Sequence, residues 1–429
     1  MPYFTPLKFL HASTGQENKK DGKISEITEH SAVLDIGKNT AARTRTSRKG
    51  IPLKQGAEHS PVSRAMPVFY NPYMKLNRDT AILLLSAWER DRLQVALPLA
   101  ASGVRGIRML KELPSSKIKA LAFNDASPEA YARIQHNLKR NKFPRFDASP
   151  AYRPSRKKIT VTNQDASRFL LDSTGFDYID LDPFGSPVLF LDAALSRMAR
   201  GGMLAVTATD TAALAGSSPC ACLRRYGARP LRGELMHEIG LRILIGHIQR
   251  IAALHERAAR PVFSYAQRHY IRAVFLCEKS KKEADSILQH QGYLLYCPSC
   301  GQREPAAHVF NIQECSICKK NRVWAGPLWL GNLWEKTFVA RMLFSAESGY
   351  SSLLSFLSLI HQEAGIEVTG FYDIHQLAKN NHLLRIPKKD TLISAIKKQG
   401  YCASETHFNS KALRTTMPLQ LLQKLIRDH

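Results

Sequence analysis

The sequence Asp182-Pro-Phe-Gly185 places an acid, a proline and an aromatic ring directly after an apolar stretch. The carboxylate of Asp182 can accept a hydrogen bond from an exocyclic amine, while the ring of Phe184 stacks on the base that carries the amine. Pro183 has no N–H to give to a β-ladder, so we expect the preceding strand to end there. Open α/β sheets bind their ligands at such strand ends. Taken alone, the motif is more typical of a β-turn with a buried phenylalanine.

Groups of the same kind follow three earlier predicted strands. A glycine loop, residues 101–106, opens a helix after the first strand, although glycines also serve tight packing. The second strand ends at Asp125, whose carboxylate can accept both hydroxyls of a ribose. The third ends at Asp165 and Ala166, where a carboxylate can accept from an adenine amino group. This series matches the S-adenosylmethionine site of class I methyltransferases better than an NAD site, because D-P-[PF]-x at the fourth strand belongs to amino-directed methyl transfer.

An alternation of strands and helices must position these groups. Such alternation predicts an α/β fold with a parallel, doubly wound sheet. A loop rich in Lys and Arg, residues 139–158, approaches the third strand and suits phosphates. We expect strands at residues 93–97, 119–123, 159–161, 178–181 and 202–207, and helices ending near 113, 141, 171 and 198.

Arg78 and Asp79 stand at the predicted start of an apolar helix, residues 80–88. An acid there is explained as a cap or a first-turn residue. A cation opposes the dipole at a helix N-terminus, so Arg78 has no such local explanation. We therefore expect Arg78 to serve a ligand.

Two C-x2-C pairs predict a metal site further along the chain. They form the set expected for a tetrahedral zinc ribbon, which is structural because four thiolates leave no open coordination position. Glu234, His237 and Glu238 share a predicted helix, but a satisfied surface or interdomain histidine is the better interpretation. The predicted zinc ligands are Cys297, Cys300, Cys315 and Cys318.

The chain has 429 residues, long enough for two or three domains, and its 61 basic residues outnumber 36 acidic ones. Such a charge predicts a polyanionic partner, with nucleic acid ahead of an anionic membrane. We expect no membrane association, because no apolar run reaches the roughly 18 residues of a membrane span. We also expect no secretory signal. Residues 1–65 are predicted to form a basic N-terminal arm, either disordered or packed as strands and turns. The cysteine pattern favours a reducing compartment, the cytoplasm, or the nucleus in a eukaryote.

Several segments resemble the tRNA (guanine-26, N2) dimethyltransferases. The similarity runs in order from about residue 68 to 418. It implies a class I, Rossmann-like methyltransferase domain at residues 66–275. It also implies a smaller α+β RNA-binding domain at 276–429, with the zinc ribbon at 295–320. The segments are Phe69-Tyr-Asn-Pro-Tyr-Met-Lys-Leu-Asn-Arg-Asp79, Ala101-Ser-Gly-Val-Arg-Gly-Ile-Arg108, Asn124-Asp125, Asp182-Pro-Phe-Gly-Ser-Pro187 and Thr406-His-Phe-Asn409.

The resemblance also implies roles for individual residues. Asp182 would be the catalytic acid residue, aided by the carbonyl of Pro183, with Phe184 in the guanine pocket and Phe69 opposing it. Leu97-Pro-Leu-Ala100 departs from relatives that carry an acid there, and Glu405 and Arg414-Thr-Thr-Met417 depart near the C-terminus, where tRNA contacts would differ. The implied S-adenosylmethionine contacts are Arg78, Arg105, Asp125, Asp165 and the backbone of Ala166.

The expected reaction is methyl transfer from S-adenosylmethionine to N2 of a guanosine, at position 26 of tRNA, giving mono- and dimethylguanosine. We expect the enzyme to be a monomer that binds tRNA. Two alternatives remain open. One is an amino-directed methyltransferase acting on rRNA or DNA; the other is a non-catalytic zinc-ribbon protein that binds RNA.

Overall fold

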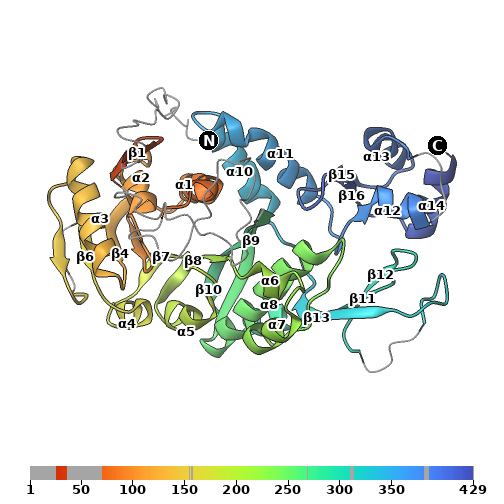
Figure 1. Ribbon diagram of the computed structural model, residues 1–429, viewed down its shortest axis with the longest axis horizontal. Coiled ribbons are helices and arrows are strands. Elements are labelled where there is room, and N and C mark those ends of the chain that lie inside the picture. The colour runs from red at the N-terminus through yellow and green to blue at the C-terminus, as the bar shows by residue number, and fades with distance from the viewer. Residues whose placement is uncertain are drawn as a thin grey trace, which may run out of the picture. The chain divides into compact units, whose positions relative to one another are not determined.

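A computed structural model describes residues 26–35, 70–153, 155, 158–267, 269–309, 314–380 and 386–428. The described residues divide into two compact units, one that ends at Thr174 and one that begins at Gly175. We call them the N-terminal unit and the C-terminal unit and describe each by itself (Figure 1). Both combine helices with β-sheet, which confirms the predicted α/β class.

The N-terminal unit alternates strands and helices after a short hairpin. Its elements are β1 (Glu26–Glu29), β2 (Ala32–Asp35), the 3₁₀ helix η1 (Pro72–Met74), α1 (Lys75–Ala87), β3 (Leu93–Leu97), α2 (Val104–Glu112), β4 (Ile118–Asn124), α3 (Pro128–Arg140), β5 (Asp147–Ser149), β6 (Ile159–Thr162) and α4 (Ala166–Leu171).

Parallel strands in the order β5-β6-β4-β3 form the sheet of this unit. The strand β5 lies within residues 139–158, which the sequence predicted to be a loop; three residues are too short to give a periodic signal. The helix α3 begins at Pro128 because the residues around that position cap its N-terminus. Ser127 accepts from the N–H of Ala130, Pro128 occupies the first turn, and Lys139 and Arg140 stand in the last turn.

The hairpin β1–β2 packs against α2 and α3 of the same unit. Asn141 fixes it in register, since its Oδ1 accepts from the N–H of Val33 and its Nδ2 donates to the carbonyl of Val33. Asn137 makes the same pair of bonds with Asp35. Of the two alternatives for the N-terminal arm, packing as strands and turns is therefore right for residues 26–35. The rest of the arm lies outside the described residues.

The C-terminal unit begins with β7 (Phe176–Leu181). Its further elements are α5 (Val188–Ser196), β8 (Met198–Ala208), α6 (Thr211–Leu214), α7 (Pro219–Tyr226), α8 (Met236–Leu254), β9 (Arg257–Gln267), β10 (Tyr270–Lys279), α9 (Lys281–Gln289), β11 (Gln291–Tyr296), β12 (Arg303–Ala306), β13 (Val323–Trp329), α10 (Lys336–Ala346), the 3₁₀ helix η2 (Ser351–Leu353), α11 (Leu354–Glu363), β14 (Tyr372–Asp373), α12 (Ile374–Asn380), α13 (Lys389–Lys398), β15 (Ala403–Glu405), β16 (Ala412–Thr415) and α14 (Leu419–Asp428).

Its first sheet has the order β7-β8-β10-β9. The strands β7 and β8 are parallel, whereas β10 is antiparallel to both β8 and β9. The sequence predicts a further strand at residues 273–277, which lies within β10, and predicts none at the position of β9. Figure 1 shows β9 and β10 side by side, and α8 packs on β9, β10 and β13. The apolar face of this helix thus closes the core.

Two small antiparallel sheets complete the C-terminal unit, in the orders β12-β11-β13 and β14-β16-β15. Residues of α12, α13 and α14 share a buried cluster with three cysteines in the segments that connect the strands of the first small sheet. This bears out the predicted zinc ribbon and smaller α+β region. Within the described ranges, no helix has the length and apolar character that crossing a membrane requires.

Candidate active site

The glycine loop and Asp125 are joined by hydrogen bonds in the N-terminal unit. Asp125, directly after β4, accepts from the N–H of Ala101 at 2.8 Å and from the N–H of Ser127 at 3.0 Å. Burial raises the pKa of Asp125, against the lowering effect of these two bonds. Gly106 has a packing role, since a Cβ there would lie 2.4 Å from the ring of Phe123. The loop after β3 and the acid after β4 therefore form one preorganised edge.

Asp165 and Ala166 lie at the start of α4. Asp165 is the N-cap, and its Oδ1 accepts from the N–H groups of Ser167 and Arg168 at 2.9 and 3.0 Å. Its side chain is exposed, whereas Ala166 is buried. A capping acid at the third strand end can also accept from a ligand, because a carboxylate has several lone pairs.

Arg78 lies inside α1, not at its start, because η1 leads into a helix that begins at Lys75. Contrary to the sequence argument, the structure gives Arg78 a local partner. Its Nε and Nη2 donate to Glu29 of β1 at 2.7 and 2.5 Å, and its Nη1 donates to the carbonyl of Asn71 at 3.1 Å. Both side chains are buried. The position of Arg78 is therefore explained by an ion pair within the protein.

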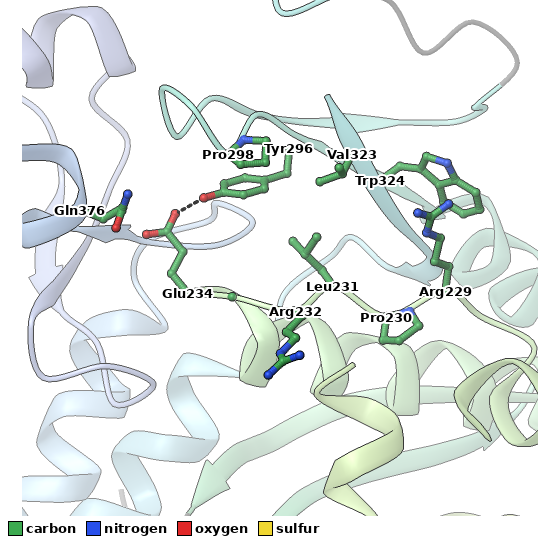
Figure 2. A pocket seen from close by; sticks show the side chains of 11 residues that line it. Arg229, Pro230, Leu231, Arg232, Glu234, Tyr296, Pro298, Val323, Trp324 and Gln376 are labelled. Carbon is green, nitrogen blue, oxygen red and sulfur yellow. Dashed lines mark hydrogen bonds between the residues drawn. The ribbon is translucent and has the colours of Figure 1, made fainter. Parts of the chain in front are cut away.

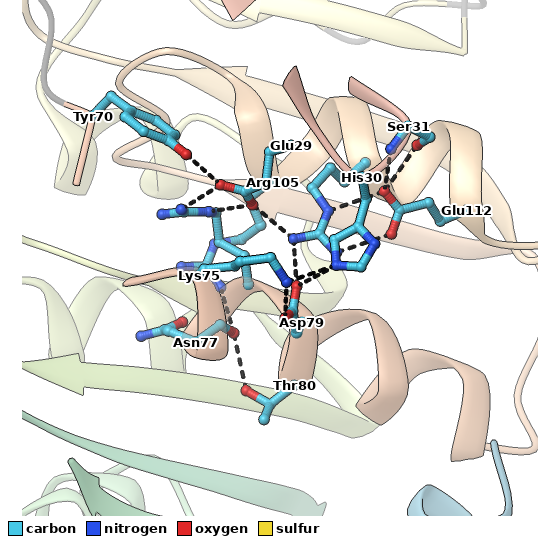
Figure 3. Close-up of polar contacts among 12 residues, drawn as sticks. Glu29, His30, Ser31, Tyr70, Lys75, Asn77, Asp79, Thr80, Arg105 and Glu112 are labelled. Carbon is cyan, nitrogen blue, oxygen red and sulfur yellow. Dashed lines mark hydrogen bonds and ion pairs between the residues drawn. The ribbon is translucent and has the colours of Figure 1, made fainter. Parts of the chain in front are cut away.

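Glu29 is the hub of a buried cluster of charges (Figure 3). The hydroxyl of Tyr70 and Nη1 of Arg108 also donate to its carboxylate, each at 2.7 Å. Burial raises the pKa of Glu29, but Arg78 and Arg108 outweigh it and hold that pKa at about 2. Arg108 also pairs with Asp79 at 2.7 Å, so Asp79 is a buried counter-ion; the predicted capping role is wrong. The carboxylates of the cluster are ionised at neutral pH.

Arg105 lies one turn before Arg108 on α2. It is buried, and its Nη1 lies 3.5 Å from the carbonyl of Asn77 in α1. The structure thus brings Arg78 and Arg105 to neighbouring helices of the N-terminal unit. Phe69 lies outside the described residues.

The Asp182-Pro-Phe-Gly185 motif forms a turn directly after β7 in the C-terminal unit. Gly185, at φ 104°, anchors the turn: its N–H donates to Oγ1 of Thr209 at 2.6 Å, and its carbonyl accepts from the N–H of Thr209 at 2.9 Å. The ring of Phe184 is 51% exposed, whereas an ordinary β-turn with a packing phenylalanine would bury it. Asp182 is half-buried and Pro183 is buried. The turn presents an acid and an aromatic face to solvent.

A buried ion pair stiffens the strand that carries this turn. Arg272 of β10 donates from both Nη atoms to Asp180 of β7, at 3.0 and 2.8 Å. Thr207 and Tyr178 add bonds of 2.8 and 2.7 Å to the pair. The sequence analysis missed these residues, although a charged residue inside an apolar strand signals a buried partner.

Tyr270 lies close enough to Asp182 for their charges to interact. Burial, Tyr265 and the Asp182 carboxylate together raise the pKa of Tyr270, which keeps its hydroxyl protonated. The hydroxyls of Tyr270 and Tyr265 are 3.4 Å apart. The neutral hydroxyl of Tyr270 adds no charge that would compete with a substrate.

The predicted zinc ligands come together in the C-terminal unit. The four Sγ atoms all lie within 4.8 Å of one another, and two of the pairs are 3.4 and 3.5 Å apart. Tetrahedral Zn–S bonds of about 2.3 Å would give S···S separations of about 3.8 Å. The two knuckles share one backbone pattern, since Gly301 and Lys319 donate to the carbonyls of Cys297 and Cys315 at 2.9 Å. This donor set fits a structural zinc ion.

A second buried charge cluster lies in the C-terminal unit. Arg414 of β16 donates to Glu238 of α8 at 2.7 Å and to Glu363 of α11 at 3.2 Å. Glu363 also accepts from Thr406 at 2.6 Å and lies 2.5 Å from Nδ1 of His407. Arg414 is fully buried, so it does not contact tRNA, and the sequence departure there is structural. Glu238 is likewise a buried partner rather than a metal ligand.

The chain is similar in sequence to a family of known proteins over most of its length. Residues 43–427 match the model of the family described as N2,N2-dimethylguanosine tRNA methyltransferase. The chain is 35% identical over 376 residues to tRNA (guanine(26)-N(2)/guanine(27)-N(2))-dimethyltransferase of Aquifex aeolicus, covering 86% of this chain and 91% of the relative. It is 38% identical over 374 residues to tRNA (guanine(26)-N(2))-dimethyltransferase of Pyrococcus furiosus, covering 85% and 93%.

Among solved structures, the chain is similar to Trm1 from Pyrococcus horikoshii in complex with S-adenosyl-L-methionine. The TM-score is 0.77 at 33% identity, over 94% of this chain and 99% of that one. These matches confirm the resemblance and the expected enzyme class, an S-adenosylmethionine-dependent tRNA (guanine-N2) methyltransferase. The chain belongs to the family of N2,N2-dimethylguanosine tRNA methyltransferases.

Proposed function

We propose that this enzyme methylates N2 of guanosine 26 in tRNA, once and then again, with S-adenosylmethionine as the methyl donor. The observation that carries the proposal is the turn after β7, which holds the half-buried Asp182 beside the exposed ring of Phe184. An acceptor for amine hydrogens beside an aromatic face suits a guanine. The names of the matched relatives support the same substrate.

The chemistry that Asp182 must assist is the alkylation of a poor nucleophile. The lone pair of the exocyclic nitrogen is delocalised into the purine. Asp182 and the carbonyl of Pro183 would accept its hydrogens and hold the nitrogen toward the methyl group. The N–C bond forms as the S–C bond breaks, the sulfonium becomes a neutral thioether, and the proton leaves through Asp182 to water. Positioning and proton transfer of this kind accelerate a step by roughly 10²- to 10⁴-fold.

Phe184 would stabilise the substrate once the base has left its stack. Guanosine within folded tRNA must be unstacked before its amine is reachable, at a cost of a few kcal/mol. Stacking on an exposed aromatic ring contributes about 1–3 kcal/mol and offsets part of that cost. Phe69 would face the other side of the base, as the family resemblance implies.

The donor would be held by residues of the N-terminal unit. Asp125 accepts from the ribose hydroxyls, and Asp165 with the backbone of Ala166 binds the adenine. Oδ1 of Asp165 takes both capping bonds, so Oδ2 is the oxygen assigned to the amino group. Arg78 and Arg105 would bind the carboxylate end of the donor, with Glu29 fixing the orientation of Arg78.

We also infer the wider setting of the enzyme. Residues 66–275 would form the methyltransferase domain and residues 276–429 the RNA-binding domain. The enzyme would act on tRNA as a monomer in the cytoplasm, or in the nucleus of a eukaryote. Light scattering of the purified protein measures the mass, and a dimer at assay concentration contradicts the monomer.

The function is tested by methylating a tRNA transcript in vitro and analysing its nucleosides by mass spectrometry. We expect mono- and dimethylguanosine from the wild-type transcript and neither product after guanosine 26 is replaced by adenosine. Product that persists in that transcript identifies a different guanosine, and replacing guanosine 27 next shows whether it is the neighbour. Methylation of rRNA or DNA without methylation of tRNA contradicts the proposal.

A further inference from the structure

The C-terminal unit contains a cavity of about 430 Å³ beside the zinc ribbon (Figure 2). The segment before α8, strands β11 and β13 and helix α12 surround it. Tyr296 and Pro298 flank the zinc ligand Cys297, so the ribbon builds one wall. The volume is in the range of small-ligand pockets, about 300–1,000 Å³. The cavity is large enough for a single nucleotide.

The middle of this cavity is lined by apolar and flat groups. Leu231 and Pro230 come from the segment before α8, Pro298 comes from the ribbon, and Val323 comes from β13. Figure 2 shows Leu231 directed toward the wall that holds Tyr296 and Val323. Walls of this kind suit the faces of a planar ring.

A cation on an aromatic platform marks one end. The guanidinium of Arg229 lies 4.8 Å from the ring centroid of Trp324, and Tyr293 braces the same indole edge-on at 5.7 Å. The backbone of Arg229 is fixed by hydrogen bonds of 2.8 and 2.9 Å to Gly326. The side chain is nevertheless exposed. An exposed guanidinium whose position is fixed in this way is well suited to bind a phosphate.

Hydrogen-bonding groups mark the opposite end. Glu234 accepts from the hydroxyl of Tyr296 at 2.7 Å, and Gln376 of α12 lies on the same side of the cavity. Burial raises the pKa of Glu234. A carboxylate with further lone pairs and an amide with donors and an acceptor together match the edge of a base that carries an amino group.

We propose that this cavity binds one unpaired nucleotide of the tRNA substrate, with its base against Leu231 and Tyr296 and its phosphate at Arg229. RNA-binding proteins commonly read unpaired bases in this manner, by stacking and by hydrogen bonds to the base edge. The inference rests on the proposed function and adds a contact that is separate from the methylated guanosine. It gives the zinc ribbon a role, because the ribbon supplies Tyr296 and Pro298 and leads into β13, which carries Trp324.

Substitutions at both ends of the cavity test the proposal. Arg229→Ala and Glu234→Gln are compared with Arg260→Ala, an exposed arginine of β9 that does not line the cavity. Binding of the tRNA transcript used in the methylation assay is measured by fluorescence anisotropy at several salt concentrations. We expect each cavity variant to bind between about 5-fold and 100-fold more weakly, and the control to bind as wild type. Arg229→Ala should also lower the salt slope by about one.

Three further measurements separate this proposal from the proposed function and from misfolding. Zinc stoichiometry, thermal melting and the Kd for S-adenosylmethionine should equal those of the wild type in both variants. If the wild-type enzyme methylates no tRNA, the proposed function is refuted. The binding comparison between the variants still tests the cavity in that case. Cavity variants that bind the transcript within twofold of wild type overturn the proposal. Guanosine monophosphate, titrated by calorimetry, is the second probe; binding of this nucleotide with unchanged tRNA affinity overturns it as well.

Discussion

Glu29 and Arg78 face each other as a fork, with both oxygens of the carboxylate bonded to the guanidinium at 2.7 and 2.5 Å. The two residues are 49 positions apart, and Glu29 lies before residue 43, where the family match begins. The short hairpin that carries Glu29 is therefore an integral part of the N-terminal unit. It holds an arginine that we assign to the methyl donor.

Replacing Glu29 should destabilise the N-terminal unit and weaken donor binding. Glu29→Gln leaves Arg78 without its buried counter-charge, and breaking such a pair costs about 3–5 kcal/mol. Denaturant unfolding measures the loss, and calorimetry measures the Kd for S-adenosylmethionine. The control is Asp172→Asn, which removes an exposed ion pair of 3.7 Å worth about 0–1 kcal/mol. Equal free energies of unfolding for the two variants would show that the buried ion pair of Glu29 does not stabilise the fold.

The stability of the protein should fall as acid protonates Glu29. Its pKa is lowered from 4.5 to about 2 by folding, so its contribution is complete above about pH 5 and is lost as the pH falls from 4.5 toward 2. The shift corresponds to about 3 kcal/mol. Unfolding free energy measured from about pH 5 down to about pH 2 should decline less steeply in Glu29→Gln than in the wild type. Parallel curves contradict the assignment.

Asp182→Asn should lower the rate of methyl transfer while leaving the donor bound. The amide keeps the shape of the side chain but loses the proton acceptor, and general-base contributions are about 10²- to 10⁴-fold. Single-turnover methylation of a tRNA transcript measures the rate, and calorimetry measures donor affinity. Asp192→Asn, on the exposed face of α5, should match the wild type. An Asp182→Asn variant with wild-type turnover would sink the catalytic assignment.

Loss of the zinc ribbon should impair tRNA binding before donor binding. Cys315→Ser removes one of the four thiols, and structural zinc sites contribute folding energy directly. We expect less than one zinc per chain by elemental analysis, a lower melting temperature and weaker tRNA binding. Cys402→Ser, at an exposed cysteine outside the cluster, is the matched control. Full zinc content in the Cys315 variant would rule out the ribbon.

Local patterns explain what could be predicted from the sequence. Asp125, Asp165 and Asp182 each follow a short apolar strand, and the cysteine spacing alone identifies the ribbon. These features depend on neighbours within a few residues. The sequence also predicts an amphipathic helix or helix pair at residues 229–258, which contains α8, and a helix at residues 391–398, which lies within α13.

Partners far apart in the sequence explain what could not be predicted. The sequence predicts a ligand as the partner of Arg78. Its partner in the structure, Glu29, could not be predicted because it lies in a polar, basic segment with no strand signal. The strand β9 contains Pro261 and two arginines, which obscure its alternation. The departure from the family pattern at Arg414 predicts altered tRNA contacts, since nothing near it in the sequence shows that Glu238 and Glu363 surround it.

The pairing of Glu238 with Arg414 also limits how early the C-terminal unit can fold during translation. The two residues are separated by 176 positions, so a ribosome that adds roughly 5–20 residues per second needs on the order of ten seconds or more between them. Throughout that interval Arg242, one turn along α8, is the cation paired with Glu238, and burying the helix leaves the second carboxylate oxygen without its Arg414 donor. The C-terminal unit should therefore settle late in synthesis, and its apolar helix α8 is the segment that a nascent-chain chaperone would have to shield.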